Sequence, residues 1–146
     1  MTLTSRLERL PGLGAAVLAE TPIEAGDVVI VHSVSGRNAA AVEFAQGSRQ
    51  RGAFVIAVTS MQNSRSVQPR QSGMPRLFET ADLLVLDDLD PVGDALVELP
   101  GLSQRVGPIS TVTGSAMLDA VVVRGRAAAG AHWRCTDFYE FQPGPG

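Results

Sequence analysis

Residues 28–38 read Val-Val-Ile-Val-His-Ser-Val-Ser-Gly-Arg-Asn, and this stretch decides the fold. Its first four residues are apolar and β-branched, as in parallel strands that are buried on both faces. A hydroxyl-rich turn with a glycine follows, and an alanine-rich segment suited to a helix comes next, with Asn38 as a candidate N-cap. The stretch therefore predicts a strand, a turn and a helix in succession.

The same pattern recurs along the chain. Residues 53–59 and 83–86 repeat the buried-strand signature, and residues 38–51 have one apolar and one polar face, as an amphipathic helix does. Strands that alternate with helices form parallel βαβ units with right-handed crossovers. We therefore predict an α/β protein built on an open, doubly wound parallel sheet.

Further elements are expected on both sides of these units. Residues 3–19 carry helical patterns with a Pro-Gly interruption, residues 95–99 suit a short strand, and a helix begins near Ser110. The polar residues 61–74 are typical of a functional loop or lid, and a short helix is expected at 75–81.

Composition and charge exclude several classes of protein. The 146 residues are 45% hydrophobic and 18% charged, which suits one globular domain. Twelve Lys and Arg against fifteen Asp and Glu give a formal net charge of -3, so the chain lacks the basic surface that nucleic acids and anionic membranes require. We expect neither nucleic acid nor a membrane as a partner.

The single cysteine, Cys135, excludes an internal disulfide and is typical of a reducing compartment. With His132 it forms an isolated His-x-x-Cys, which is too few ligands for a zinc site, so we predict no metal and no cofactor. The N-terminus lacks the apolar core of a signal peptide, and no apolar run reaches the roughly 20 residues of a membrane span. We expect a soluble, cytoplasmic protein.

The turn after the first predicted strand has the geometry of an anion site. The first turn of a helix leaves backbone N–H groups without intrahelical partners, and the helix dipole places partial positive charge there. A phosphate therefore fits at this turn, residues 32–38. The local sequence leaves an alternative open, since Ser33 and Ser35 also suit an ordinary turn with capping hydroxyl groups.

Four motifs in order carry a family resemblance. They are Ser-x-Ser-Gly-Arg-Asn at 33–38, Ala-Val-Thr-Ser at 57–60, Pro-Val-Gly-Asp at 91–94 and Gly-Pro-Ile-Ser-Thr-Val-Thr at 107–113. Together they resemble the SIS (sugar isomerase) domain, in particular a bacterial branch of phosphosugar-binding proteins. We predict a partial SIS domain over residues 1–123 and a divergent, poorly ordered tail over 124–146.

The resemblance implies a three-layer, flavodoxin-like αβα sandwich that binds a sugar phosphate at the carboxyl ends of its strands, where open parallel sheets place their ligands. It also implies an incomplete domain. The family begins with a central strand that ends in a Gly-Ser or Thr-Ser turn, and no such segment precedes Val28. The first central strand is therefore expected to be missing, and the open sheet edge together with the family's use of a neighbouring chain implies a homo-oligomer.

The resemblance also implies which residues hold the phosphate. Ser33, Ser35 and Asn38 would donate hydroxyl or amide hydrogens to its oxygens. Gly36 would let the backbone approach, and Arg37 would supply positive charge. Four hydroxyl residues, at a strand end and at the start of the last helix, complete the set: Thr59, Ser60, Ser110 and Thr111. For Thr59 and Ser60 an alternative stays open, since hydroxyl groups often cap strand ends.

No catalytic residue is assigned. Aldose–ketose isomerisation needs a carboxylate or histidine that moves a proton between adjacent carbons. His32 is better explained as a packed residue at the strand end, and four carboxylates are expected on solvated faces: Glu43, Glu79, Glu98 and Asp119. Three arginines of the polar segment can either close over a ligand or remain in solvent: Arg65, Arg70 and Arg76.

The sequence therefore predicts binding of a small-molecule sugar phosphate through Ser/Thr-rich strand-to-helix turns. A phosphosugar isomerase, or a related sugar-phosphate enzyme, would also turn the ligand over. Two alternatives stay open: a non-catalytic phosphosugar-sensing module, and a truncated chain without autonomous function, which the absent strand and the unusual tail favour.

Overall fold

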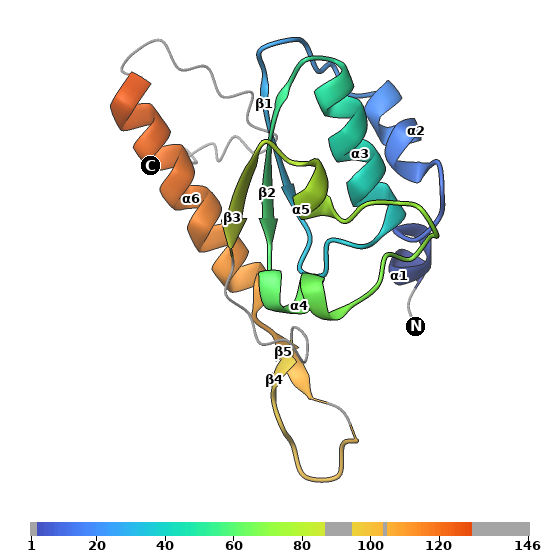
Figure 1. Ribbon diagram of the computed structural model, residues 1–146. Coiled ribbons are helices and arrows are strands. Elements are labelled where there is room, and N and C mark those ends of the chain that lie inside the picture. Colours follow the sequence, from blue (N-terminus) through green and yellow to red (C-terminus); the bar gives the residue numbers. More distant parts are fainter. Residues whose placement is uncertain (1–2, 87–94, 104, 130–146) are drawn as a thin grey trace, which may run out of the picture.

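Three parallel strands lie at the centre of the computed structural model, which describes residues 3–86, 95–103 and 105–129 (Figure 1). The helices are α1 (Leu3–Leu7), α2 (Leu13–Ala19), α3 (Ala39–Gln50), α4 (Met61–Ser66), α5 (Leu77–Thr80) and α6 (Ser110–Ala129). The strands are β1 (Val28–His32), β2 (Phe54–Thr59), β3 (Leu83–Leu86), β4 (Ala95–Val97) and β5 (Val106–Pro108). Strands β1 to β3 alternate with helices along the chain, as the βαβ pattern requires.

The central sheet has the strand order β1-β2-β3, and both strand pairs are parallel. His32 lies beside Val58 and Thr59 lies beside Leu86, so the three strands end along one common edge. Helix α3 connects β1 to β2, and α4 and α5 connect β2 to β3. The predicted α/β class with a parallel sheet is confirmed.

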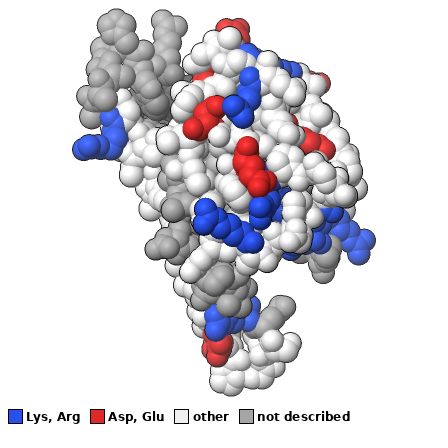
Figure 2. Space-filling model, viewed as in Figure 1, with Lys and Arg blue, Asp and Glu red and all other residues white. Residues whose placement is uncertain are grey.

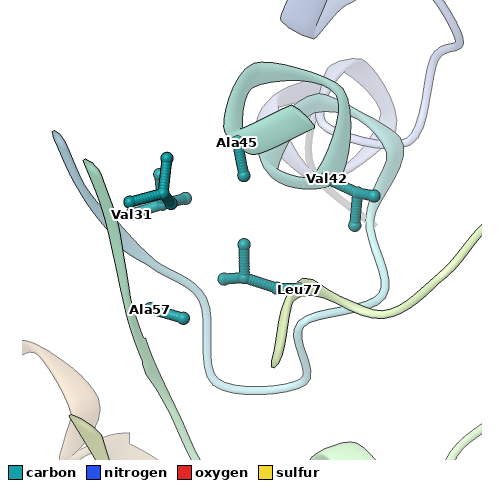
Figure 3. Close-up of a cluster of buried hydrophobic side chains, with 6 residues drawn as sticks. Val31, Val42, Ala45, Ala57 and Leu77 are labelled. Atoms are coloured by element: carbon teal, nitrogen blue, oxygen red, sulfur yellow. The ribbon is translucent and has the colours of Figure 1, made fainter. Parts of the chain in front are cut away.

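One face of this sheet packs on helices α3 and α5. Val31 and Ala57 of the sheet cluster with Val42 and Ala45 of α3, and Leu77 of α5 closes the cluster (Figure 3). All five side chains are buried. Their removal from water is the main favourable contribution to folding, so this layer is the core of the protein.

Helix α2 forms a further layer outside α3. The Glu43 carboxylate of α3 accepts hydrogen bonds from the amides of Gly12 (2.9 Å and 3.0 Å) and Gly14 (3.1 Å), at the amino end of α2. Gly14 lets the two helices approach closely, since a Cβ there would collide with the Ala40 carbonyl oxygen. Glu43 therefore holds α2 against α3 instead of lying on a solvated face as the sequence suggested.

The opposite face of the sheet is only partly covered, contrary to the expectation of strands buried on both faces. Helix α6 lies on that side (Figures 1 and 3) and meets the sheet at Gly114, where an added Cβ would collide with the His32 ring. At the amino ends of the strands, Val28, Phe54 and Leu83 are 62%, 46% and 48% exposed. The difference arises because this helix approaches the sheet at the carboxyl ends of the strands.

Two shorter segments differ from the sequence prediction. The first residues of the predicted loop at 61–74 form helix α4, because the Ser60 hydroxyl accepts a hydrogen bond from the Asn63 amide (3.2 Å) and caps that helix. The strand expected at 95–99 is present as β4, but it pairs antiparallel with β5 in a separate two-stranded sheet. Neither the cap nor the pairing is visible in the periodicity of apolar residues.

Helix α6 begins at Ser110, as predicted, and continues to Ala129. It therefore includes the first residues of the segment expected to form a tail over 124–146. The rest of that segment, with His132 and Cys135, lies outside the described residues, as does the motif at 91–94. Within the described ranges, no helix is both long and apolar enough to cross a membrane.

Charged side chains of both signs share the surface. Figure 2 shows basic and acidic groups side by side on the face that it displays. Two ion pairs contribute to this mixture, Arg49 with Asp82 (3.0 Å) and Arg76 with Glu79 (3.0 Å). The hydrogen bond from the Arg76 side chain lowers the pKa of Glu79 below its ordinary value. The mixed surface is in keeping with the formal net charge of -3.

Replacing Leu77 by alanine should lower the free energy of unfolding by about 2–5 kcal/mol, because it leaves a cavity between α3 and the sheet. Urea denaturation followed by circular dichroism measures this change. Leu10→Ala is the matched control, since Leu10 is 51% exposed, and it should cost less than about 1 kcal/mol. Equal losses in the two variants would contradict the assigned core.

Candidate functional site

The turn between β1 and α3, residues 33–38, is attached to the sheet at its start. The Ser33 amide donates to the Val58 carbonyl (3.0 Å) and extends the pairing of β1 with β2. The Gly36 amide donates to the Ser33 carbonyl (3.1 Å), which closes the turn. Gly36 has a φ of +57°, which residues with a side chain rarely adopt. The glycine is therefore a requirement of the turn's backbone.

The end of β2 holds this turn in place through hydrogen bonds to its backbone. The Val34 carbonyl accepts hydrogen bonds from the Thr59 hydroxyl (2.9 Å) and from the Ser60 amide (3.1 Å). Thr59 and Ser60 are completely buried, and the Ser60 hydroxyl also caps α4. Both residues thus position the turn, which favours the structural alternative that the sequence left open for them.

The helices after β2 bind the next two carbonyl groups of the turn. The Ser35 carbonyl accepts a hydrogen bond from the Ser64 hydroxyl of α4 (2.9 Å). The Gly36 carbonyl accepts one from the Leu77 amide at the start of α5 (2.7 Å). The carbonyl groups of residues 34–36 are thus paired with the protein, whereas the side chains of Ser33 and Ser35 belong to the wall of the cavity described below and bring hydroxyl donors to it.

Arg70 joins the polar segment between α4 and α5 to the same turn. Its amide donates to the Arg37 carbonyl (3.4 Å), and its Nε donates to the Asn38 side-chain oxygen (2.9 Å). Asn38 occupies the N-cap position of α3, as predicted, but its side chain makes no capping hydrogen bond. In the first turn of α3, the Ala40 amide donates to the Glu8 carbonyl (3.1 Å). Three parts of the chain therefore meet at the start of α3.

A cavity of about 830 Å³ opens where these parts meet, at the carboxyl ends of the strands. Open parallel sheets bind their ligands at this position. The amino ends of α3 and α6 both reach it, since Asn38 and Ser110 belong to its wall. The wall is formed by side chains from four parts of the chain: Glu8, Arg9, His32, Ser33, Val34, Ser35, Arg37, Asn38, Asn63, Val67, Arg70, Ser110, Thr111, Ser115 and Leu118.

Most of the predicted phosphate-binding residues come together in this wall, namely Ser33, Ser35, Arg37, Asn38, Ser110 and Thr111. Gly36, Thr59 and Ser60 are not part of it. Gly36 belongs to the turn itself, whereas Thr59 and Ser60 lie beneath it and hold it in place through hydrogen bonds to the Val34 carbonyl. Residues distant in the sequence thus share one cavity, as a common ligand requires.

The cavity wall also contains residues that the sequence analysis did not assign. Glu8 and Arg9 come from the segment after α1, and Asn63 comes from α4. No local motif marks them, because only the packing of their segments around α3 brings them to the cavity. Ser115 follows Thr111 by one helical turn, so the helical spacing alone could have placed both residues on the same face of α6.

The three arginines of the polar segment have different surroundings. Arg70 is part of the cavity wall. Arg76 pairs with Glu79 (3.0 Å), and its guanidinium lies 4.8 Å from the centre of the Phe78 ring. Arg65 is exposed and outside the wall. Arg70 is therefore the member of this group that can meet a ligand.

Positive charge gathers at the cavity. The guanidinium groups of Arg9, Arg37 and Arg70 belong to its wall, together with the Glu8 carboxylate. Partial desolvation lowers the pKa of Arg70, and the positive charges of Arg37 and Arg9 lower it further, whereas Glu8 raises it. The arginines therefore repel one another, and a bound anion would relieve this repulsion.

His32 has two roles at the end of β1. Its ring lies next to Gly114 of α6, yet the residue is exposed and also forms part of the cavity wall. Glu98 pairs with Arg105 (2.9 Å), and Asp119 is exposed, so neither carboxylate reaches the cavity.

Residues 1–60, which contain β1, the turn, α3 and β2, match the SIS domain family. The turn at 33–38 and the buried hydroxyl groups beneath it are thus features of the SIS region, whereas Arg70 and the start of α6 come from the chain that follows.

UPF0309 proteins of several bacteria extend the similarity beyond the SIS region. The protein of Shouchella clausii is 45% identical over 124 residues, which are 85% of this chain and 50% of the relative. That of Brucella anthropi is 43% identical over 118 residues (81% and 47%), and that of Streptomyces griseus is 40% identical over 121 residues (83% and 48%). The chain spans about half the length of the curated relatives it matches.

Gly36→Ala should lower the free energy of unfolding by about 1–3 kcal/mol more than Gly73→Ala does. Both glycines have positive φ, +57° and +80°, so both variants strain the backbone. A Cβ at Gly36 would lie 3.0 Å from the Ser64 hydroxyl and 3.2 Å from the Leu77 Cβ, whereas nothing lies within 4 Å at Gly73. Urea denaturation compares the two, and equal losses would contradict the close packing beneath the turn.

Proposed function

We propose that this chain binds a sugar phosphate in the cavity, with the phosphate against the 33–38 turn and the start of α6. The turn is the main support for this proposal. Ser33 and Ser35 belong to the cavity wall, whereas the carbonyl groups of the turn accept hydrogen bonds from the protein beneath it. A phosphate accepts hydrogen bonds and is repelled by carbonyl oxygens directed at it. A turn that presents hydrogen-bond donors to the cavity, with its carbonyl acceptors bonded elsewhere, is therefore suited to bind a phosphate.

Two helix ends add to the attraction for an anion. Helix α3 has 12 residues and α6 has 20, and both begin at the cavity. The amino end of a helix acts as roughly half a positive charge and carries N–H groups without intrahelical partners. Ser110 and Thr111 add hydroxyl groups at the second of these ends.

The SIS domain of residues 1–60 supports phosphosugar binding in general. A more specific form of the proposal is that the chain isomerises the bound sugar phosphate. This reaction needs a group that takes up and returns a proton. Among the described residues of the wall, Glu8 and His32 have side chains suited to this step. A sensing module would use the same cavity without turnover, and a cytoplasmic location stays a prediction.

The midpoint of thermal unfolding, measured with a panel of phosphorylated aldoses and ketoses, tests the proposal. A ligand that binds only the folded chain raises this midpoint, and the unphosphorylated sugars should not. Ser35→Ala should weaken binding by roughly tenfold, because it removes a hydrogen-bond donor to a charged group. Ser72→Ala is the matched control, since Ser72 is exposed and outside the cavity wall.

The outcomes separate the alternatives. A cooperative transition that no phosphorylated sugar shifts would contradict the proposal. A shift with interconversion of aldose and ketose, detected by NMR, would identify an isomerase, and a shift without it would identify a sensing module. The absence of any cooperative transition would favour a chain without autonomous function.

We also propose that the chain forms a homo-oligomer. Within the described ranges, β1 has a neighbouring strand on one side, and the apolar side chains of Val28, Phe54 and Leu83 are exposed on one face of the sheet. An open strand edge and an exposed apolar face both favour association. Phe54→Ser should shift sedimentation equilibrium toward the monomer, whereas Leu102→Ser, at a residue 53% exposed, should not. A monomeric parent chain would contradict this proposal.

A further inference from the structure

Asn63 is the most deeply buried of the described residues in the cavity wall. It is 8% exposed, whereas the other described wall residues are half-buried or exposed. It lies on α4, next to Ser64, whose hydroxyl group donates to the Ser35 carbonyl of the turn (2.9 Å). Asn63 therefore forms the floor of the cavity, beside the residue that supports the turn.

The backbone of Asn63 is bonded on both sides, but its side chain is not. The amide donates to the Ser60 hydroxyl (3.2 Å), and the carbonyl accepts a hydrogen bond from the Ser66 hydroxyl (2.8 Å). The side-chain carboxamide has no hydrogen-bond partner among the described residues, yet neither its oxygen nor its nitrogen is sealed inside the protein. Both atoms are therefore open to the cavity.

A carboxamide that is largely removed from water and lacks a partner costs free energy, which a ligand of matching chemistry would restore. Its oxygen accepts hydrogen bonds and its nitrogen donates them. A phosphate dianion only accepts, so it would leave the Asn63 oxygen unpaired beside a negative charge. Two hydroxyl groups on adjacent carbons can donate to the oxygen and accept from the nitrogen at once. The chemistry of Asn63 thus matches the sugar and not the phosphate.

The second asparagine of the wall has the opposite character. The Asn38 side-chain oxygen already accepts a hydrogen bond from the Arg70 Nε (2.9 Å). The NH₂ donors of Asn38 are thus the part of its carboxamide that remains for a ligand, and donors suit a phosphate. The two asparagines therefore differ in which end of a sugar phosphate they can bind.

We infer that Asn63 binds hydroxyl groups of the sugar and determines how the ligand lies in the cavity. The sugar lies on α4, and the phosphate lies at the 33–38 turn and the start of α6. The inference rests on the proposed phosphate binding and adds a specificity-determining residue to the same site. Because Asn63 is uncharged and deeply placed, the end of the ligand on the floor is an uncharged, polyhydroxylated group.

Isothermal titration calorimetry on the full chain separates the two ends of the ligand. Methyl phosphate presents a phosphate without any hydroxyl group on carbon. Glucose 6-phosphate, fructose 6-phosphate and ribose 5-phosphate add hydroxyl groups in different arrangements. The parent chain should bind at least one of these sugar phosphates about tenfold more tightly than methyl phosphate.

Asn63→Leu should lower this affinity ratio by about fivefold or more and leave the affinity for methyl phosphate unchanged, because it removes the hydrogen bonds to the sugar alone. Gln62→Leu is the matched control, since Gln62 precedes Asn63 on α4, is exposed and lies outside the wall, and it should keep the parent ratio. Asn63→Ala repeats the comparison with a smaller side chain if leucine prevents folding.

The midpoint of thermal unfolding of the ligand-free chain tests for a merely structural role. The Asn63 carboxamide has no partner to lose among the described residues, so its removal should not lower this midpoint. A marked decrease in both Asn63 variants would show that the side chain supports the fold and would overturn the inference.

The binding outcomes distinguish this inference from the function on which it rests. Equal affinities of the parent chain for methyl phosphate and all three sugar phosphates would overturn the sugar contact and leave phosphate binding in place. Binding of none of these ligands by a cooperatively folded chain would overturn both. An unchanged ratio in the Asn63 variants, or an equal loss of affinity for every ligand, would overturn the assignment to Asn63.

Discussion

Hydrogen bonds to the carbonyl groups of residues 34–37 hold the site together, and every one of their donors lies in the chain from Thr59 to Leu77. Buried backbone acceptors must be paired, so the turn cannot change shape without breaking several bonds at once. This arrangement fixes the start of α3 and aligns the turn's donors before any ligand arrives. A site that is ordered in advance spends less binding free energy on ordering.

The sheet positions this turn, and helices cover mainly one of the two faces of that sheet. Helices α3 and α5 bury one side of β1 and β2, whereas α6 meets the other side at the carboxyl ends of the strands. The cavity therefore forms between the turn and α6, where the two helix ends converge. The same geometry leaves Val28, Phe54 and Leu83 exposed at the amino ends. The site end of the sheet is thus the better enclosed one.

Much of this fold could be predicted from the sequence, because β-branched runs and helical periodicity are local signals. Those signals locate β1, β2, β3 and α3, and the Ser-x-Ser-Gly turn is the feature that predicts an anion site. They do not separate residues that face the cavity from residues beneath it. Ser35 and Thr59 carry the same functional group, and only packing sends one to the wall and the other to the Val34 carbonyl.

The sequence by itself determined the strand, turn and helix at 28–50, since each follows from residue types within a few positions of one another. Only the tertiary structure decided which charges share the cavity. Arg9, Arg37 and Arg70 are separated by long stretches of chain, and the hydrogen bonds from Ala40 to Glu8 and from Arg70 to Asn38 bring their segments together. Electrostatic interaction depends on distance in space, so a positively charged cavity can form in a chain of negative net charge.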